Sequence, residues 1–385
     1  MKAQETNEKE SSDNHPTLTL FLCGDVMPGR GIDQIMPHPS DPVLFEPYVR
    51  NARDYLKLAE DTNGPIPKLV APAYIWGDSI AVLAAVKPDL SIINLETSVT
   101  TSSDYWPGKG INYRMNPGNI GCLAAAGIDC CVLANNHVLD WGYAGLVETL
   151  QVLKQQGIKS VGAGTDRQQA EAPAIFDLAG KGRLLVFAYG LPSSGIALAW
   201  AAGAVRPGVN LLPDLSEASI LRIKKEVRAV KKSGDLVLFS LHWGGNWGYE
   251  IPEAEKRFAH RLIDEVGVDA LFGHSSHHFK GIEVYRGKLI LYGCGDFIND
   301  YEGISGYEQF RDDLTLMYFP TFDSATGRLL QLRLAPMQIK RFRLIHAAPD
   351  DKEWITRVLN REGKQFETRV HADRAGNLNL KWVHR

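Results

Sequence analysis

The sequence predicts an α/β fold whose buried strands end at one polar rim. Two observations support this prediction. Apolar runs of strand length occur along the chain together with segments of helical periodicity. Five of these runs, at residues 18–23, 90–93, 130–134, 236–241 and 268–272, are each followed directly by a short polar motif. In open α/β sheets ligands bind beyond the carboxyl ends of the strands, so five such motifs predict one functional site.

The other elements follow in chain order from periodicity and turn signals. Residues 37–64 are rich in proline and polar residues, and the length of this segment predicts an insertion over the site rim. Pro117 opens one predicted helix and Gly157 closes another. We expect helices over residues 48–60, 79–86, 116–126, 143–156, 216–232, 253–266 and 351–360. We expect further strands over 158–161, 184–189, 314–319 and 329–334, a hairpin over 283–291 and a second irregular insertion over 191–215.

Composition and charge are those of an ordinary soluble globular protein. Of the 385 residues, 44% are hydrophobic and 23% are charged, and the net charge is −3. The chain lacks the clustered basic surface of a nucleic-acid-binding protein, so we expect no nucleic-acid partner. Five cysteines without metal-site spacing favour a reducing compartment. The chain begins without the apolar segment of a signal peptide, and no apolar run reaches about 18 residues. These features predict a cytoplasmic protein without a membrane span.

The five polar motifs supply the ligand types of a metal-dependent hydrolase. They are Gly24-Asp25, Asn94-Leu95-Glu96, Asn135-Asn136-His137, His242-Trp243-Gly244 and Gly273-His274-Ser275-Ser276-His277. The candidate metal ligands are two carboxylates, one amide oxygen and three imidazoles, namely Asp25, Glu96, Asn136, His242, His274 and His277. This mixture of oxygen and imidazole ligands suits Mn, Fe or Zn better than Ca. We therefore expect divalent metal ions, two in number, which together polarise a substrate oxygen and activate a water molecule.

His137 has a different predicted role from its neighbour Asn136. In an extended backbone successive side chains point to opposite sides, so His137 would face the substrate while Asn136 faces the metal. A charged imidazole beside a leaving oxygen is a general acid. Asp140, three residues further on, could orient the imidazole by a hydrogen bond. We therefore predict His137 and Asp140 as catalytic residues.

Each candidate also has a purely structural interpretation. Asp25 could cap the N-terminus of a helix, as an aspartate after a strand often does. Asn135 and Asn136 could form a turn, and His242 could be a hydrogen-bonded core histidine. The joint occurrence of five motifs at five strand ends favours the metal site over these alternatives.

Several longer motifs resemble the CapA family, which is named for poly-γ-glutamate capsule synthesis and is similar to calcineurin-type metallophosphoesterases. They are Gly24-Asp25-Val26-Met27-Pro28-Gly29-Arg30, Asn94-Leu95-Glu96, Ala134-Asn135-Asn136-His137-Val138-Leu139-Asp140-Trp141-Gly142, Gly162-Ala163-Gly164, His242-Trp243-Gly244 and Gly273-His274-Ser275-Ser276-His277. The resemblance covers residues 17–340, which we expect to form one domain. We expect residues 1–16 to be a disordered tail and residues 341–385 to be an extension that packs on this domain.

The resemblance implies a four-layer α/β/β/α sandwich with loop insertions and with metal ions at the strand ends. It assigns Asp25 and His277 to one metal ion, with Glu96 as the bridge between the two ions. The other ion would be held by three residues, Asn136, His242 and His274. His137 would be the acid, and Arg30 and Asn135 would contact the substrate.

The chain departs from the family pattern at three places. Met27 stands where metallophosphoesterases carry a histidine, so one ion position is short of a ligand. Ser275 and Ser276 replace the middle of a Gly-His-His-Pro-His motif. Asp296 stands where the family usually has asparagine, and it could either restore the coordination or be an ordinary loop residue. CapA proteins are usually anchored in a membrane; we expect no anchor in this chain, which argues against a capsule role.

Two functions from different classes follow from these observations. The first is a metal-dependent hydrolase that acts on a phosphoester or on a γ-glutamyl amide. The alternative is a non-catalytic accessory or binding protein for poly-γ-glutamate assembly, which the loss of a histidine at Met27 favours. A nuclease is a third idea, against which the near-neutral charge and the lack of a strip of aromatic and basic residues argue.

Overall fold

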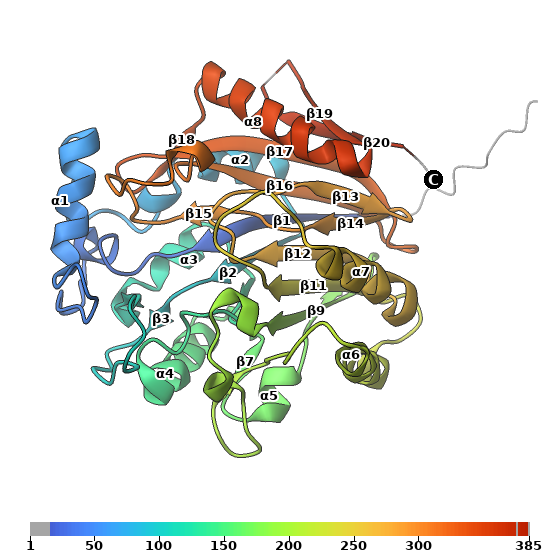
Figure 1. Ribbon diagram of the computed structural model, residues 1–385, viewed down its shortest axis with the longest axis horizontal. Coiled ribbons are helices and arrows are strands. Elements are labelled where there is room, and N and C mark those ends of the chain that lie inside the picture. The colour runs from blue at the N-terminus through green and yellow to red at the C-terminus, as the bar shows by residue number, and fades with distance from the viewer. Residues whose placement is uncertain (1–15, 375, 384–385) are drawn as a thin grey trace, which may run out of the picture.

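The computed structural model describes residues 16–374 and 376–383 as a mixed α/β protein (Figure 1). The strands are β1 Thr17–Val26, β2 Leu90–Leu95, β3 Ser98–Val99, β4 Arg114–Met115, β5 Cys130–Val132, β6 Lys159–Val161, β7 Ala163–Gly164, β8 Ala174–Leu178, β9 Gly182–Gly190, β10 Gly208–Val209, β11 Leu236–His242, β12 Ala270–His274, β13 Ile282–Tyr285, β14 Lys288–Leu291, β15 Asp296–Ile298, β16 Leu314–Asp323, β17 Leu329–Ile339, β18 Leu344–His346, β19 Thr368–Ala372 and β20 Leu378–Trp382. The α-helices are α1 Ala52–Asn63, α2 Ser79–Val86, α3 Gly121–Ala125, α4 Gly142–Gln155, α5 Arg167–Glu171, α6 Glu217–Val230, α7 Glu253–Arg261 and α8 Pro349–Glu362.

Two main mixed sheets form the centre of the described part of the chain. The larger sheet has ten strands in the order β19-β20-β17-β16-β1-β2-β5-β6, with β15 beside β1 and β18 beside β17. The smaller sheet has six strands in the order β13-β14-β12-β11-β9-β8. Strands β1, β2, β5 and β6 run parallel to one another, and so do β9, β11, β12 and β14.

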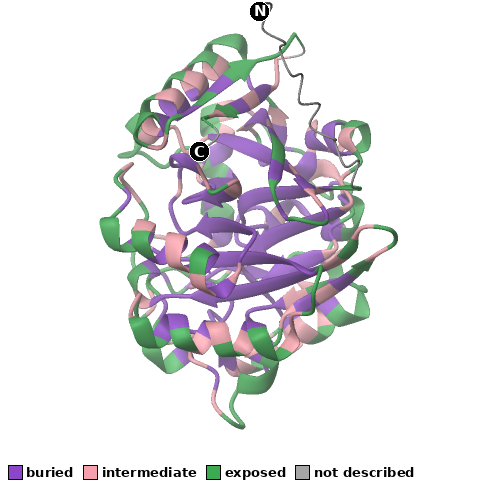
Figure 2. Cartoon of the chain, turned by 90° about the vertical axis from the view of Figure 1, so that its right-hand side faces the viewer, coloured by how far each residue is buried: buried purple, intermediate pink, exposed green. Residues whose placement is uncertain are grey.

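The alternation of side chains along the strands divides most of the hydrophobic core among three large clusters, beside a small fourth one formed by Leu44, Ala52 and Tyr55. On β1, Leu20 packs in a cluster that strands of both sheets share, whereas Phe21 packs with helices α1, α2 and α4. On β11, Leu238 packs in the shared cluster, whereas Phe239 packs with helices α6 and α7. Figure 2 shows the consequence: the strands are buried, and the exposed residues gather on the surrounding helices and loops.

Strand pairing brings the predicted polar motifs to the carboxyl ends of the parallel strands. Asp25 on β1 lies opposite Asn94 on β2, and His242 on β11 lies opposite His274 on β12. The short strand β15 adds a further residue, because Asp296 pairs with Asp25. The two sheets thus deliver their polar side chains to one region.

All five strands that precede a polar motif form as predicted, and the predicted hairpin forms between β13 and β14. The helix expected over 116–126 is shorter, because a 3-10 turn at Pro117–Asn119 precedes α3.

The segment after residue 340 contains strands β18, β19 and β20 in addition to the expected helix. The domain boundary at residue 340 stays a prediction. Residues 1–15 of the expected tail lie outside the described residues. No helix in the described ranges is long and apolar enough to cross a bilayer.

Candidate metal centre

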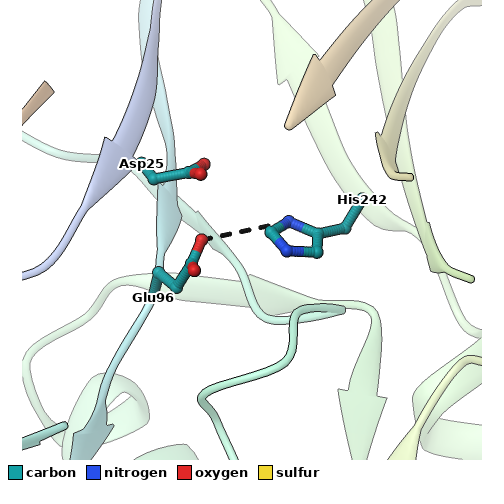
Figure 3. Close-up of side chains that lie close together, drawn as sticks. All are labelled: Asp25, Glu96 and His242. Carbon is teal, nitrogen blue, oxygen red and sulfur yellow. Dashed lines mark ion pairs between the residues drawn. The ribbon is translucent and has the colours of Figure 1, made fainter. Parts of the chain in front are cut away.

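Three buried side chains converge where the two sheets meet. Asp25 lies near the end of β1, Glu96 follows β2, and His242 ends β11; each offers one ligand atom within 4.8 Å of the others. Their relative exposures are 0%, 1% and 1%. Figure 3 shows the two carboxylates approaching from one side and the imidazole from the other, with Nδ1 of His242 3.9 Å from a carboxylate oxygen of Glu96. This group could hold a metal ion.

Asn94 holds the two carboxylates of this group in place. Its side-chain amide donates hydrogen bonds to Oδ1 of Asp25 at 2.8 Å and to Oε2 of Glu96 at 3.0 Å. The amide oxygen of Asn94 accepts a hydrogen bond from Asn135 at 2.9 Å. The motif Asn94-Leu95-Glu96 does not reveal this role of Asn94 in the sequence, because only the paired strands show which carboxylates its amide reaches.

Two other predicted ligands contact the group through short nitrogen–oxygen distances. Nδ1 of His274 lies 2.8 Å from Oδ1 of Asp25, and Nε2 of His242 lies 3.0 Å from Oδ1 of Asn136. The remaining ring nitrogens, Nδ1 of His242 and Nε2 of His274, are buried and have no hydrogen-bond partner among the described residues. Buried polar atoms in native proteins are nearly always partnered, so these two nitrogens fit a site completed by a bound ion.

The electrostatics of the group also fit a bound cation. Burial and the negative charge of Asp25 raise the pKa of Glu96 well above its usual value. Burial opposes ionisation of Asp25 too, but the hydrogen bond and charge of His274 bring the pKa of Asp25 below its usual range. Burial lowers the pKa of His242 to about 3, which leaves the neutral imidazole that metals bind. A cation would offset the repulsion between the two carboxylates.

His137 and Asp140 form a hydrogen-bonded pair beside Glu96. Nδ1 of His137 lies 2.7 Å from Oδ2 of Asp140, and its Nε2 lies 3.8 Å from Oε1 of Glu96. Lys109 contacts both members of the pair, with Nζ 2.8 Å from Nδ1 of His137 and 2.7 Å from Oδ1 of Asp140. Burial lowers the pKa of His137 to about 4; the charge of Lys109 contributes, whereas Asp140 opposes the shift. No sequence motif marks Lys109, because it is a lone lysine in the loop between β3 and β4.

His277 lies apart from the buried group and pairs with Asp296. Its Nδ1 is 2.9 Å from one carboxylate oxygen of Asp296 and 3.2 Å from the other. Its Nε2 lies 3.1 Å from the side-chain nitrogen of Asn246. Burial opposes protonation, but Asp296 raises the pKa of His277 above its usual value. His277 therefore contacts Asp296, which pairs with Asp25 on the neighbouring strand. It does not belong to the buried group of Asp25, Glu96 and His242.

The two residues expected to contact substrate already have protein partners. The buried guanidinium of Arg30 pairs with Asp300 at 2.5 Å and with Glu46 at 3.2 Å. Asn135 donates to Asn94 and to the carbonyl of Leu95, and its side-chain oxygen accepts two backbone N–H groups. The expected contact of these two residues with substrate stays a prediction. In the structure both side chains bind protein groups around the site.

Comparisons with known proteins agree with this arrangement of motifs. Residues 19–301 match the model of the family described as bacterial capsule synthesis protein PGA_cap. A probable polyglutamine synthesis accessory protein of Mycobacterium tuberculosis is 44% identical over 358 residues, which cover 93% of this chain and 94% of the relative. The PGA biosynthesis protein CapA of Bacillus subtilis is 26% identical, over 82% of this chain and 71% of the relative.

A solved structure with 10% identity covers 84% of this chain and 99% of its own, but its TM-score of 0.38 is too low to support an argument. The family match and the mycobacterial relative confirm the resemblance to CapA proteins. The chain therefore belongs to the PGA_cap family of bacterial capsule synthesis proteins.

Proposed function

We propose that this protein is a metal-dependent hydrolase of poly-γ-glutamate biosynthesis type, acting on a phosphoester or on a γ-glutamyl amide. The observation that carries the proposal is the buried group of Asp25, Glu96 and His242, beside which the pair of His137 and Asp140 lies. A set of metal ligands without a proton donor beside it would fit a metal ion that only binds a ligand or stabilises the fold. A histidine with a carboxylate partner next to the metal group supplies the proton transfer that hydrolysis needs.

The donors suit two ions of Mn, Fe or Zn. Asp25, Glu96 and His242 would hold an ion, and the contacts of Asn136 with His242 and of His274 with Asp25 place both residues beside them. Bound divalent ions supply a Lewis acid for the substrate oxygen and lower the pKa of a water molecule. We expect metal binding to be tight because Asn94 holds both carboxylates in position.

His137 would protonate the leaving group. Nδ1 of His137 faces Asp140, so Nε2 is directed toward Glu96 and the metal group and would carry the proton that is transferred. A neighbouring negative charge raises the pKa of an imidazole, so an anionic substrate arriving beside His137 would favour the protonated form. Lys109 and the backbone N–H of Tyr113 hold Asp140 in place.

The proposed fold supports this function. Helices α1, α2 and α4 pack with one face of the larger sheet, and α6 and α7 pack with one face of the smaller sheet. The remaining faces share a core. We propose that these layers correspond to the α/β/β/α sandwich of the metallophosphoesterases, in which metals bind at the strand ends.

A non-catalytic accessory role is the second candidate. The mycobacterial relative bears the name of an accessory protein, and Met27 stands where a second ion position would have a histidine. In this role the protein would bind poly-γ-glutamate or a precursor without cleaving it.

A metal-dependent activity screen separates the two candidates. The full-length protein is assayed with p-nitrophenyl phosphate, bis-p-nitrophenyl phosphate and a γ-glutamyl p-nitroanilide after chelation and after addition of Mn or Zn. The hydrolase proposal expects activity that returns with metal and is lost in His137→Ala. Glu353→Gln, which changes an exposed carboxylate on α8, is the control. Metal-independent activity, or equal activity in His137→Ala, would refute the assigned mechanism.

A further inference from the structure

A row of aromatic rings runs along the rim of the site and begins at the candidate acid His137. The ring of Tyr113 lies 4.4 Å from that of His137, and its hydroxyl lies 2.8 Å from the hydroxyl of Tyr301. The ring of Tyr301 lies 5.4 Å from the ring of His277, which in turn lies 5.2 Å from the ring of Trp247. The row thus leads from the proton donor of the proposed reaction to Trp247, in the loop after β11.

Tyr307 ends this row with an exposed ring. It lies in the loop after β15 and stacks on Trp247, with the ring centroids 3.9 Å apart and the ring planes 5° apart. Trp247 is half-buried, and Tyr307 is 41% exposed. Tyrosine and tryptophan offer a large contact area with few rotatable bonds, so an exposed pair beside a site is a suitable contact for a ligand.

Backbone contacts hold this pair of rings in place. The backbone N–H of His277 donates to the carbonyl of Asn246 at 3.0 Å, and that of Gly248 donates to Nε2 of His278 at 3.1 Å. Phe310 packs against Trp247 at a ring distance of 5.3 Å. The loop is therefore fixed on both sides of Trp247, and a ligand would bind the pair with little loss of conformational entropy.

The charges beside the pair limit what it can bind. Asp296 contacts His277 at 2.9 Å, and Asp312 lies close enough for its charge to act on His277. Because like charges repel, a second anionic group of the substrate would be disfavoured at this end of the row. Stacked rings instead attract flat apolar surfaces through dispersion. This end therefore fits an uncharged part of the substrate that contains a ring.

We propose that Trp247 and Tyr307 form a platform that binds a flat, uncharged ring of the substrate, either an aryl group or a sugar ring, while the bond to be cleaved lies at the metal group. The inference rests on the proposed function and narrows its substrate class. A linear γ-glutamyl chain contains no ring, so the platform favours a phosphoester whose organic part is cyclic. The two residues would act on specificity rather than on the chemical step.

Ligand-observed NMR titration of the full-length protein in MnCl₂ tests the platform without turnover. Phenylphosphonate and methylphosphonate carry the same anionic group on a stable carbon–phosphorus bond and differ in the ring. The wild type is expected to bind phenylphosphonate at least ~5-fold more tightly than methylphosphonate. Tyr307→Ala and Tyr307→Leu should lose this preference, since leucine keeps apolar bulk without a ring. Tyr307→Phe should retain it.

Tyr48→Ala is the matched control. Tyr48 is 95% exposed, makes no ring contact within the described ranges and should not affect the preference. Equal binding of the two phosphonates by the wild type, or a preference that persists in Tyr307→Ala, would overturn the platform. The stacked rings would then only join two loops.

Two further ligands identify the chemistry of the bound group. Methyl β-N-acetylglucosaminide is a neutral sugar ring, and binding that is lost in Tyr307→Ala would assign the platform to sugars. Failure of this ligand to bind, beside the expected preference for phenylphosphonate, would assign it to aryl groups. Tighter binding of 2-aminoethylphosphonate than of phenylphosphonate would overturn the uncharged ring in favour of a cationic group.

The same titrations in EDTA separate this inference from the proposed function. Phosphonate binding that does not respond to manganese would contradict the metal centre, whereas a preference for phenylphosphonate that depends on Tyr307 would still support the platform. Loss of all phosphonate binding in EDTA would support the metal centre whatever the ring preference. Binding of neither phenylphosphonate nor the sugar, with or without manganese, would overturn the platform.

Discussion

Glu96→Gln should make the metal-free protein more stable and remove most of the stability that metal provides. Oxygens of Glu96 and Asp25 lie within 4.8 Å of each other in a buried site. At an effective dielectric constant of about 20, two unit charges at this separation repel by about 3.5 kcal/mol, which is the upper limit of the gain when one charge is removed. The metal-bound wild type should gain about 2.7 kcal/mol at a free metal concentration 100 times the Kd, and Glu96→Gln should gain much less.

The pH dependence of this effect has a definite sign. Burial and Asp25 place the folded-state pKa of Glu96 above its unfolded value. The metal-free wild type should therefore lose stability as pH rises from about 4.3, the usual glutamate pKa, through the folded-state pKa. Glu96→Gln should lack this contribution.

Urea unfolding followed by circular dichroism, in EDTA and in MnCl₂ across this pH range, measures both effects. The exposed change Glu353→Gln is the control and should alter stability by less than about 1 kcal/mol. A metal-free Glu96→Gln protein that is less stable than the wild type, or one that gains as much from manganese, would refute the reasoning.

Three further predictions concern residues around the metal group. Arg30→Met should cost about 3–5 kcal/mol in urea unfolding, because it leaves two buried carboxylates without their partner, and a cost below about 1 kcal/mol would contradict the structural role of Arg30. Asn94→Ala should weaken manganese binding by about 10–100-fold in a calorimetric titration, since both carboxylates lose their shared donor; unchanged affinity would contradict this. Lys109→Met should retain bound metal but lose up to about 100-fold in kcat, because Asp140 and His137 lose an orienting contact, and unchanged kcat would show that Asp140 alone orients His137.

The strands and the main ligands were predictable because both leave local signals in the sequence. A buried strand is a short apolar run, and the polar residue that follows it lies at the strand end whatever the tertiary structure. Asp25, Glu96 and His242 could therefore be predicted to meet, and the structure brings their ligand atoms within 4.8 Å.

The remaining features depend on contacts between distant segments. Asp296 stands beside Asp25 only because the three-residue strand β15 pairs with β1, across 270 residues of chain. Lys109 reaches Asp140 from an irregular loop that carries no motif. Strands β19 and β20 are not predicted because each is only five residues long, although Leu378, Leu380 and Trp382 of β20 alternate with polar residues. They pair with each other, and β20 also pairs with β17.

The metal content of the purified protein tests the central claim most directly. Elemental mass spectrometry on the full-length wild type, with an Asp25→Asn, Asn136→Ala variant as the control, should find Mn, Fe or Zn in the wild type and much less in the variant. One or two equivalents in the wild type would support the metal centre built on Asp25, Glu96 and His242. Absence of metal from the wild type, even after reconstitution with each ion, would contradict it.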